Sequence, residues 1–428
     1  MNNVFLKIEQ VEYEKNLSSE FLNELILNRI CTITTDNKVV FKASGFVVYK
    51  NDVYIIFPKN YIKFHNEKHN NEYIKVLFKT LMKYKNEKIL DPFESELLGG
   101  SIGNKNENIT TAFMLINDFV TNGLLIKEIT RRTTAYGGNI DWGNTVNKKD
   151  PIISGKNIIY HDKLIRKKTL DSTNLLIQLQ KFCLYKSIEK YGWLFDFEID
   201  KNLFEISELN FEISFAINFL EQQLNSTYVE RDIFVINLIK DFLIGIQHQQ
   251  IEEKIETLMT PYFHNVWESI CSNIFGNQYN SLKQIVPRLK WGLDNNAIVQ
   301  PQRPDIMLIK NKELYILDAK YYDVYKNLPG WKDIVKQFYY AETIRNHINS
   351  PAFLKNRVDT QKINNIKNIR NIFLFPSNED KPIIYIGNVT IENNSSLGVI
   401  KSYKINTFYA MKIYIGEEAN KLFVENLL

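Results

Sequence analysis

The stretch from Arg303 to Lys320 constrains this chain more than any other. Two apolar runs, Ile306 to Ile309 and Leu314 to Leu317, flank the polar turn Lys310-Asn311-Lys312, a pattern typical of a β-hairpin. Asp305 stands at the start of the first strand, and Asp318 and Lys320 stand at the end of the second. Side chains alternate along a strand, so Asp318 and Lys320 point to the same face. The hairpin should therefore gather two carboxylates and one ammonium at one end of a small sheet.

Such a cluster suits metal-dependent phosphodiester hydrolysis. Two carboxylates, a backbone carbonyl and waters are the oxygen ligands that Mg²⁺ prefers. The ion can polarise a phosphoryl oxygen and lower the pKa of a bound water. Lys320 can orient that water or stabilise charge on the phosphate. Asp-x-Lys alone would fit a surface ion pair equally well, so the whole pattern, from Pro304-Asp305 through the hairpin to Asp318-Ala319-Lys320, carries the prediction.

These motifs resemble the PD-(D/E)xK nuclease superfamily. The resemblance implies that Asp305, Asp318 and the Ala319 carbonyl hold the metal, and that Lys320 serves the attacking water. Mg²⁺ is the expected cofactor, with Mn²⁺ able to replace it. Further segments are similar to LlaJI-type restriction endonucleases and to McrC nuclease subunits. They are Phe263 to Glu268, Ile285 to Trp291, Lys336 to Tyr340 and, more weakly, Gly137 to Tyr160.

The resemblance also implies supporting residues around this cluster. An acidic residue on the helix before the hairpin lies beside the metal in the resembled family, which here indicates Glu268. A Gln/Tyr pair follows the hairpin in relatives and corresponds to Gln337 and Tyr340. Their spacing departs from the Gln-x-x-x-Tyr form, so the match at Tyr340 is weaker. Lys336 is a candidate phosphate contact.

Length and pattern predict an α+β or α/β multidomain chain. With 428 residues the chain can hold two or three domains. We expect an N-terminal β-rich recognition or partner-docking region over residues 1–165, with a meander between Cys31 and Phe57. A helical connector should cover residues 166–259, where Tyr228 to Met259 reads as one long helix. The nuclease domain should cover residues 260–428, with a mixed sheet flanked by helices.

Finer expectations concern the ends of the nuclease domain. Thr260-Pro261 should start a helix, with the threonine as its cap. Gln284 to Leu289 and Phe408 to Ile415 read as strands, and Asp333 to Asn346 as a helix.

Composition narrows the setting of this chain. A net charge of +4 permits a nucleic-acid partner without demanding one. Three widely spaced cysteines fit a reduced compartment and no zinc site. There is no signal peptide and no membrane-length apolar run, so we expect a cytoplasmic protein without a membrane partner. The glycine-rich stretch 99–105 does not satisfy the phosphate-loop pattern, so any nucleotide triphosphatase would be a separate subunit.

The predicted function is a Mg²⁺-dependent DNA endonuclease of a restriction or phage-defence system, with double-stranded DNA as substrate. One alternative is a McrC-like subunit that cuts only with a separate AAA+ GTPase. Another is a repair or RNA nuclease on the same fold. A remote alternative is a DNA-binding or scaffold protein with an inactive nuclease fold. The sequence leaves a homo-oligomer open.

Overall fold

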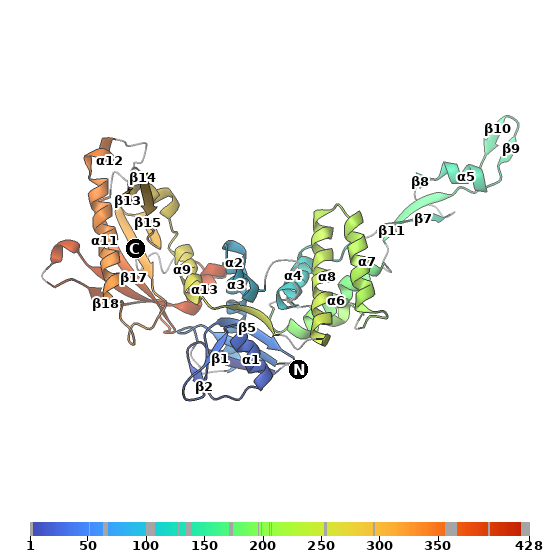
Figure 1. Cartoon of the computed structure of the whole chain (residues 1–428). Helices are drawn as coiled ribbons and strands as arrows, with labels where there is room; N and C mark the ends of the chain where they lie inside the picture. The colour runs from blue at the N-terminus through green and yellow to red at the C-terminus, as the bar shows by residue number, and fades with distance from the viewer. Residues whose placement is uncertain are drawn as a thin grey trace. The chain divides into compact units, whose positions relative to one another are not determined.

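The computed structural model divides the chain into two compact units. One comprises Met1–Gly100 with Lys254–Leu428, and the other Ser101–Glu253. The described residues are 3–50, 52–62, 67–99, 108–126, 128–133, 139–170, 174–195, 197, 199–204, 206, 208–251, 255–293, 296–355, 366–392 and 394–420. The glycine-rich stretch 99–105 lies outside them, except for Gly99. Figure 1 shows the elements of both units.

The first 60 residues build a sheet that recruits a strand from far along the chain. Its order is β1 (Asn3–Ile8), β6 (Asp52–Phe57), β5 (Ser44–Tyr49) and β12 (Glu256–Thr260). β1 and β6 are parallel, and the other pairs are antiparallel. A smaller sheet, β2 (Glu12–Tyr13), β4 (Val39–Phe41) and β3 (Cys31–Ile33), lies beside α1 (Ser19–Leu27) in sequence. The predicted strands between Cys31 and Phe57 are present, but β3 pairs with β4 in one sheet and β5 with β6 in another, so the expectation of one continuous meander was wrong.

The strand β12 corrects one prediction. Residues 256–260 do not continue the long helix expected from Tyr228 to Met259, since α8 ends at Ile251. Thr260 is the last residue of β12 and not the cap of a helix. Its hydroxyl accepts a hydrogen bond from the Tyr262 amide at 3.0 Å, and α9 begins at Phe263. Local propensity could not reveal this strand because β5, with which it pairs, lies about two hundred residues earlier.

Gly45 is where β5 and β12 approach most closely. Its φ is +138°, and a Cβ there would lie 2.2 Å from the Leu258 carbonyl oxygen. We expect Gly45→Ala to lower the free energy of unfolding by about 2 kcal/mol or more, because backbone atoms must move. Denaturant unfolding measures the loss. Gly387→Ala is the matched control, with a φ of +140° and no atom within 4 Å of the added Cβ; an equal loss in both variants would contradict the steric argument.

The C-terminal sheet carries the hairpin that the sequence predicts. Its order is β15 (Ile306–Lys310), β16 (Glu313–Ala319), β17 (Asn368–Ser377), β19 (Ile400–Asn406) and β18 (Ile383–Val389). β15 is antiparallel to β16, β16, β17 and β19 are parallel, and β18 is antiparallel to β19. The sheet is therefore mixed, as expected. The helix α11 (Trp331–Ile348), predicted from 333 to 346, packs against β16 and β17.

The segment 408–415 is a helix, and our prediction of a strand there was wrong. α13 spans Thr407–Ile415, and the Asn406 side chain caps it by accepting from the Tyr409 amide at 2.7 Å. The run is apolar at nearly every position, so its period did not distinguish a buried helix from a buried strand. α13 packs against α2 (Glu67–Glu87), where Lys83 Nζ donates to the Tyr414 carbonyl. This contact joins the two ends of the chain in one unit.

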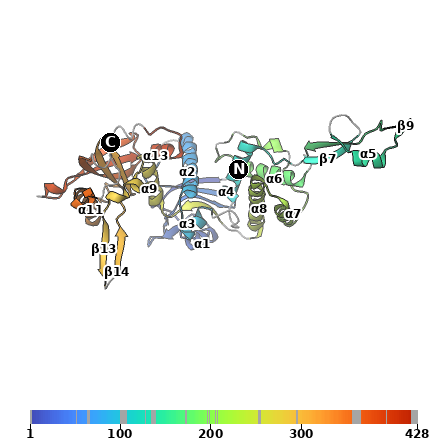
Figure 2. The ribbon, with the colours of Figure 1, turned by 90° about the horizontal axis from the view of Figure 1, so that it is seen from above.

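The remaining elements of this unit are short. They are α3 (Pro92–Leu97), α9 (Phe263–Ile274), α10 (Tyr279–Leu282), the 3₁₀ turns η2 (Lys283–Ile285) and η4 (Ser395–Leu397), β13 (Arg288–Leu293), β14 (Asn296–Pro301) and α12 (Pro351–Lys355). A strand was predicted at 284–289, but the strand proper begins at Arg288 and pairs antiparallel with β14, as Figure 2 shows.

The second unit is helical with two small β-elements. Its helices are α4 (Asn108–Asn122), α6 (Leu175–Tyr191), α7 (Ile213–Ser226) and α8 (Glu230–Ile251), with the 3₁₀ turn η1 (Lys201–Phe204). The three-stranded sheet contains β7 (Glu128–Thr133), β11 (Ile165–Leu170) and β8 (Asn139–Ile140), followed in sequence by α5 (Trp142–Lys148). β9 (Ile152–Ser154) and β10 (Asn157–Ile159) form a separate hairpin. None of the helices described is long and apolar enough to span a membrane.

Candidate active site

The hairpin brings Asp305 and Asp318 together. Ile306 pairs with Leu317 across the two antiparallel strands, so the two aspartates are the next residues outward on each strand. The Ala319 amide donates to Asp305 Oδ2 at 3.3 Å, and a hydrogen bond joins the two carboxyl groups. Asp318 is only 4% exposed. The pair was predicted from the strand pattern alone.

Asn277 fixes the backbone around Asp305. Its side-chain nitrogen donates to the Asp305 carbonyl at 2.9 Å, and its side-chain oxygen accepts from the Met307 amide at 3.1 Å. Two residues before Asp305, the Arg303 carbonyl accepts from the Tyr340 hydroxyl at 3.3 Å. Sequence reasoning missed Asn277, because a lone Asn after a helix gives no specific signal.

Lys320 lies between two carboxylates. Its Nζ is 2.7 Å from Asp318 Oδ2 and 2.8 Å from Asp333 Oδ1. Burial alone would lower the pKa of Lys320, but Asp318 and Asp333 outweigh it and raise the pKa above the ordinary value. The ammonium is therefore charged at neutral pH. Asp333, in the first turn of α11, was not predicted, since acidic residues are common at that position in any helix.

Glu268 is a third acid whose charge acts on this cluster. It is half-buried on α9, which contacts β16. Burial and then the charge of Asp318 raise the pKa of Glu268, while Lys336, Lys320 and Arg303 act in the opposite direction. Glu268 thus lies within electrostatic reach of the hairpin carboxylates.

The three remaining candidates lie on α11. Gln337 is 1% exposed and donates to the Ile316 carbonyl at 2.9 Å, so its amide ties α11 to β16. Lys336 Nζ lies 5.5 Å from the centre of the Tyr340 ring. Burial opposes the charge of Lys336, but Tyr340, Asp305 and Asp318 together raise its pKa. Lys336 and Tyr340 therefore lie beside the acids, whereas Gln337 lies behind them.

Crowding of the acids changes the titration of Asp305. Burial is the largest cause that raises the pKa of Asp305 to about 7, followed by the charges of Asp318 and Glu268. No three His, Cys, Asp or Glu side chains in the described residues form a metal-holding group as they stand. The Lys320 ammonium occupies one Asp318 oxygen. The donors nonetheless fit a hard cation chemically, because they are all oxygens and repel one another without a positive charge between them.

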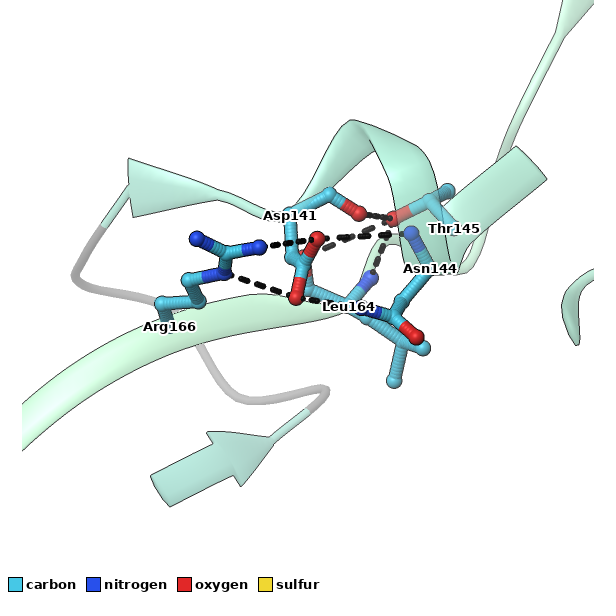
Figure 3. Close-up of polar contacts among 5 residues, drawn as sticks. All are labelled: Asp141, Asn144, Thr145, Leu164 and Arg166. Atoms are coloured by element: carbon cyan, nitrogen blue, oxygen red, sulfur yellow. Dashed lines mark hydrogen bonds and ion pairs between the residues drawn. The ribbon is translucent and has the colours of Figure 1, made fainter. Parts of the chain in front are cut away.

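The segment from Gly137 to Tyr160, whose similarity to the family is weaker, has a structural role around Asp141 (Figure 3). Asp141 is buried and only 3% exposed. Arg166 binds both carboxylate oxygens, at 2.8 and 2.9 Å, and this contact chiefly holds the pKa of Asp141 well below its usual range. Asn144 donates to the same carboxylate, and the Thr145 hydroxyl donates to the Asp141 carbonyl at 2.8 Å and accepts from the Leu164 amide at 3.0 Å. Asp141 therefore joins α5 to β11. Residues 134–138, which include the first two glycines of this segment, lie outside the described residues.

Sequence comparison gives the family. The profile of the LlaJI restriction endonuclease family matches residues 43–403, and the chain therefore belongs to that family. This confirms the resemblance predicted from the motifs. A relative, the type II restriction enzyme BsuMI component YdjA of Bacillus subtilis (strain 168), is 27% identical over 366 residues, or 79% of this chain and 73% of that protein.

Structural comparison gives weaker likenesses. A chain from an assembly of Thermococcus gammatolerans McrB AAA+ hexamers with bound McrC aligns with a TM-score of 0.44 at 12% identity, covering 97% of this chain and 99% of that one. A chain of the McrBC complex of the same organism aligns at 0.27 and 13% identity, covering 57% and 80%. Both scores are too low to define the fold.

Proposed function

We propose that this chain is a Mg²⁺-dependent DNA endonuclease of the PD-(D/E)xK type. The observation that carries the proposal is the convergence of Asp305, Asp318 and Lys320 at one end of the β15–β16 hairpin. Membership of a restriction endonuclease family supports nuclease chemistry and a role in restriction. Double-stranded DNA is the substrate we infer, and such an enzyme would act in the cytoplasm.

We assign each side chain of this cluster a role from its charge and its position. Asp305, Asp318, Glu268 and the Ala319 carbonyl are the oxygens that would hold Mg²⁺ or Mn²⁺. When bound, the ion supplies an acidified water and a positive charge beside the scissile phosphate. Lys320, held charged by Asp318 and Asp333, donates a hydrogen bond to the attacking water or the phosphate.

The α11 residues assist this core. We assign Lys336 to a DNA phosphate, because it carries a positive charge within electrostatic reach of Asp305 and Asp318 and has Tyr340 beside it. Gln337 supports catalysis by keeping α11 against β16 rather than by touching substrate. For the regions, we propose recognition or partner docking in residues 1–165, connection in 166–259 and cleavage in 260–428.

The direct test is cleavage of unmodified and methylated plasmid DNA by the purified chain with Mg²⁺. Discrete fragments that require the metal would support an autonomous endonuclease. A folded chain that cuts RNA and leaves DNA intact would overturn the proposed substrate.

A second candidate function is a nuclease subunit that cuts only with a separate AAA+ GTPase. The relative in Bacillus subtilis is named a component of a restriction enzyme, and the β9–β10 hairpin gives a structural reason. Ile152 and Ile159 pair across one face and Ile153 and Ile158 across the other, and all four are between 51% and 72% exposed. An isolated hairpin with both faces apolar is marginal in water. Such exposed apolar surface is typical of a protein–protein interface.

The partner-dependent function predicts the effect of charge in this hairpin. Ile153→Asp and Ile158→Asp together should reduce partner-stimulated DNA cleavage by roughly tenfold or more, because each buried charge opposes docking. The measurement is cleavage with and without the co-purified AAA+ GTPase. Ile89→Asp is the matched control, since Ile89 is fully exposed on a loop of the other unit. Equal stimulation of all variants would exclude the hairpin as the docking site.

A further inference from the structure

A buried glutamate from the start of the chain contacts the residue that follows Lys320. Glu9 follows β1 directly and is only 3% exposed. Its carboxylate accepts from the Ser44 hydroxyl at 2.6 Å and from the Lys59 amide at 3.3 Å. Ser44 begins β5 and Lys59 follows β6, so three segments of the N-terminal sheet fix the orientation of this carboxylate.

The fixed carboxylate holds Tyr321, the residue that follows Lys320. The Tyr321 hydroxyl donates to Glu9 Oε1. Lys59 Nζ lies 4.5 Å from the centre of the Tyr321 ring, and the Phe263 ring lies 5.4 Å away. Phe263 is the first residue of α9, the helix that carries Glu268. Glu9 therefore holds the hydroxyl of Tyr321, and Lys59 and Phe263 contact its ring.

The contact between Glu9 and Tyr321 lies just beyond the end of β16. β16 stops at Ala319, and the Lys320 amide makes the last bond to the sheet, donating to the Leu374 carbonyl at 2.9 Å. From Tyr321 to Gly330 the chain has no helix or strand. The Glu9–Tyr321 contact is thus a tether immediately after the sheet. Because misplacing a reacting group by about 1 Å can cost roughly 10²-fold in rate, a tether one residue from Lys320 bears on catalysis.

We propose that Glu9 is a positioning residue of the nuclease site, acting through Tyr321 to hold Lys320 between Asp318 and Asp333. The N-terminal sheet, far from the hairpin in sequence, then forms part of the catalytic unit instead of serving only recognition. A buried carboxylate is costly unless its hydrogen bonds are satisfied, and Ser44, Lys59 and Tyr321 satisfy it here. This inference rests on the proposed nuclease function.

The test compares Glu9→Gln, Tyr321→Phe and the double variant in the full chain. The control is Glu313→Gln with Tyr315→Phe, a second Tyr–Glu pair at the opposite end of the same strand, with an O–O distance of 3.0 Å. The measurement is single-turnover cleavage of a plasmid that the wild type cuts, at saturating Mg²⁺ and with the AAA+ partner if cleavage needs it. We expect each single variant to cut 10- to 100-fold more slowly with unchanged half-saturating DNA. The double variant should be no slower than the slower single, because both changes break one contact.

Three results would overturn the proposal. They are wild-type rates in both single variants, rate losses that multiply in the double variant, or losses explained by a smaller folded fraction. A fold-only role would lower the melting temperature in the Glu9 and Glu313 variants alike and leave the rate per folded molecule unchanged.

Hydrogen exchange separates this inference from the proposed function. Exchange of the amides of residues 319–322 should rise in Glu9→Gln and Tyr321→Phe but not in the control pair. A wild type that cuts no DNA, with exchange rising as stated, would refute the nuclease function and keep the tether. Normal cleavage by the wild type with unchanged exchange in Glu9→Gln would refute the tether and keep the nuclease.

Discussion

Replacing Asp318 with asparagine should abolish DNA cleavage, with a loss of at least about 10³-fold in rate, and leave the chain folded. Asp318 is the carboxylate that meets Asp305 on one side and the Lys320 ammonium on the other. An amide of the same size keeps the packing but removes the negative charge that would hold the metal. It also removes half of the charge that keeps Lys320 in place. The measurement is the rate of plasmid cleavage with Mg²⁺, together with the circular dichroism spectrum.

The matched control for this prediction is Asp323→Asn. Asp323 lies five residues further on, in the segment after the strand, where its carboxylate accepts from the Tyr325 amide at 3.1 Å. We expect this variant to cut DNA at a rate within about twofold of the wild type, because surface changes away from a site have small effects. Cleavage retained by Asp318→Asn would remove Asp318 from the catalytic role, whatever the control shows.

The central part of the site was predictable because its geometry is local. Asp305 and Asp318 flank one short hairpin, so strand alternation and a tight turn suffice to bring them together. Asn311 and Lys312 in that turn have φ values of 52° and 65°, as a two-residue hairpin turn requires. Glu268 and Lys336 needed the resemblance, because no local rule aims a helix face at a particular strand. The positions of Asp305, Asp318 and Lys320 in the structure agree with the predicted cluster. Their catalytic roles remain predictions.

The long-range parts of the fold were not predictable in this way. β12 was taken for the end of a helix and α13 for a strand, and in both cases the distant partner decides the structure: β5 for β12, and α2 for α13. The same reason hid Glu9. Its partner Tyr321 lies 312 residues away, and no spacing rule connects them. The resulting compact unit joins residues 1–100 with 254–428. Sequence motifs could only predict domains that follow one another along the chain.

The second large effect we expect is a pH-dependent stabilisation by Mg²⁺, for which Asp305 is the reporter. The pKa of Asp305 is raised from its ordinary value of 3.8 to about 7. Between roughly pH 4 and 7 the folded carboxyl group keeps a proton that the unfolded chain has released. Without metal, this group therefore makes the free energy of unfolding fall as pH rises through that window. Above it, the folded chain holds ionised acids close together, and a bound cation relieves their repulsion.

Mg²⁺ should therefore add little to the free energy of unfolding at pH 5.5 and on the order of 1–3 kcal/mol at pH 8. This magnitude corresponds to an ion concentration of about a hundred times its Kd or less. The measurement is denaturant unfolding with and without MgCl₂ at about 10 mM. Asp305→Asn is the decisive comparison, because its side chain has the same shape and no charge. In that variant the metal-free loss of stability between about pH 4 and 7 should shrink, and the Mg²⁺ effect at pH 8 should largely vanish, since one of the ligands is gone. A wild type that Mg²⁺ stabilises equally at both pH values would mean that the ion binds elsewhere on the chain. A wild type that no divalent cation stabilises at pH 8 would leave Lys320 as the lasting counter-charge of these acids, and the hairpin cluster as an ion-pair network.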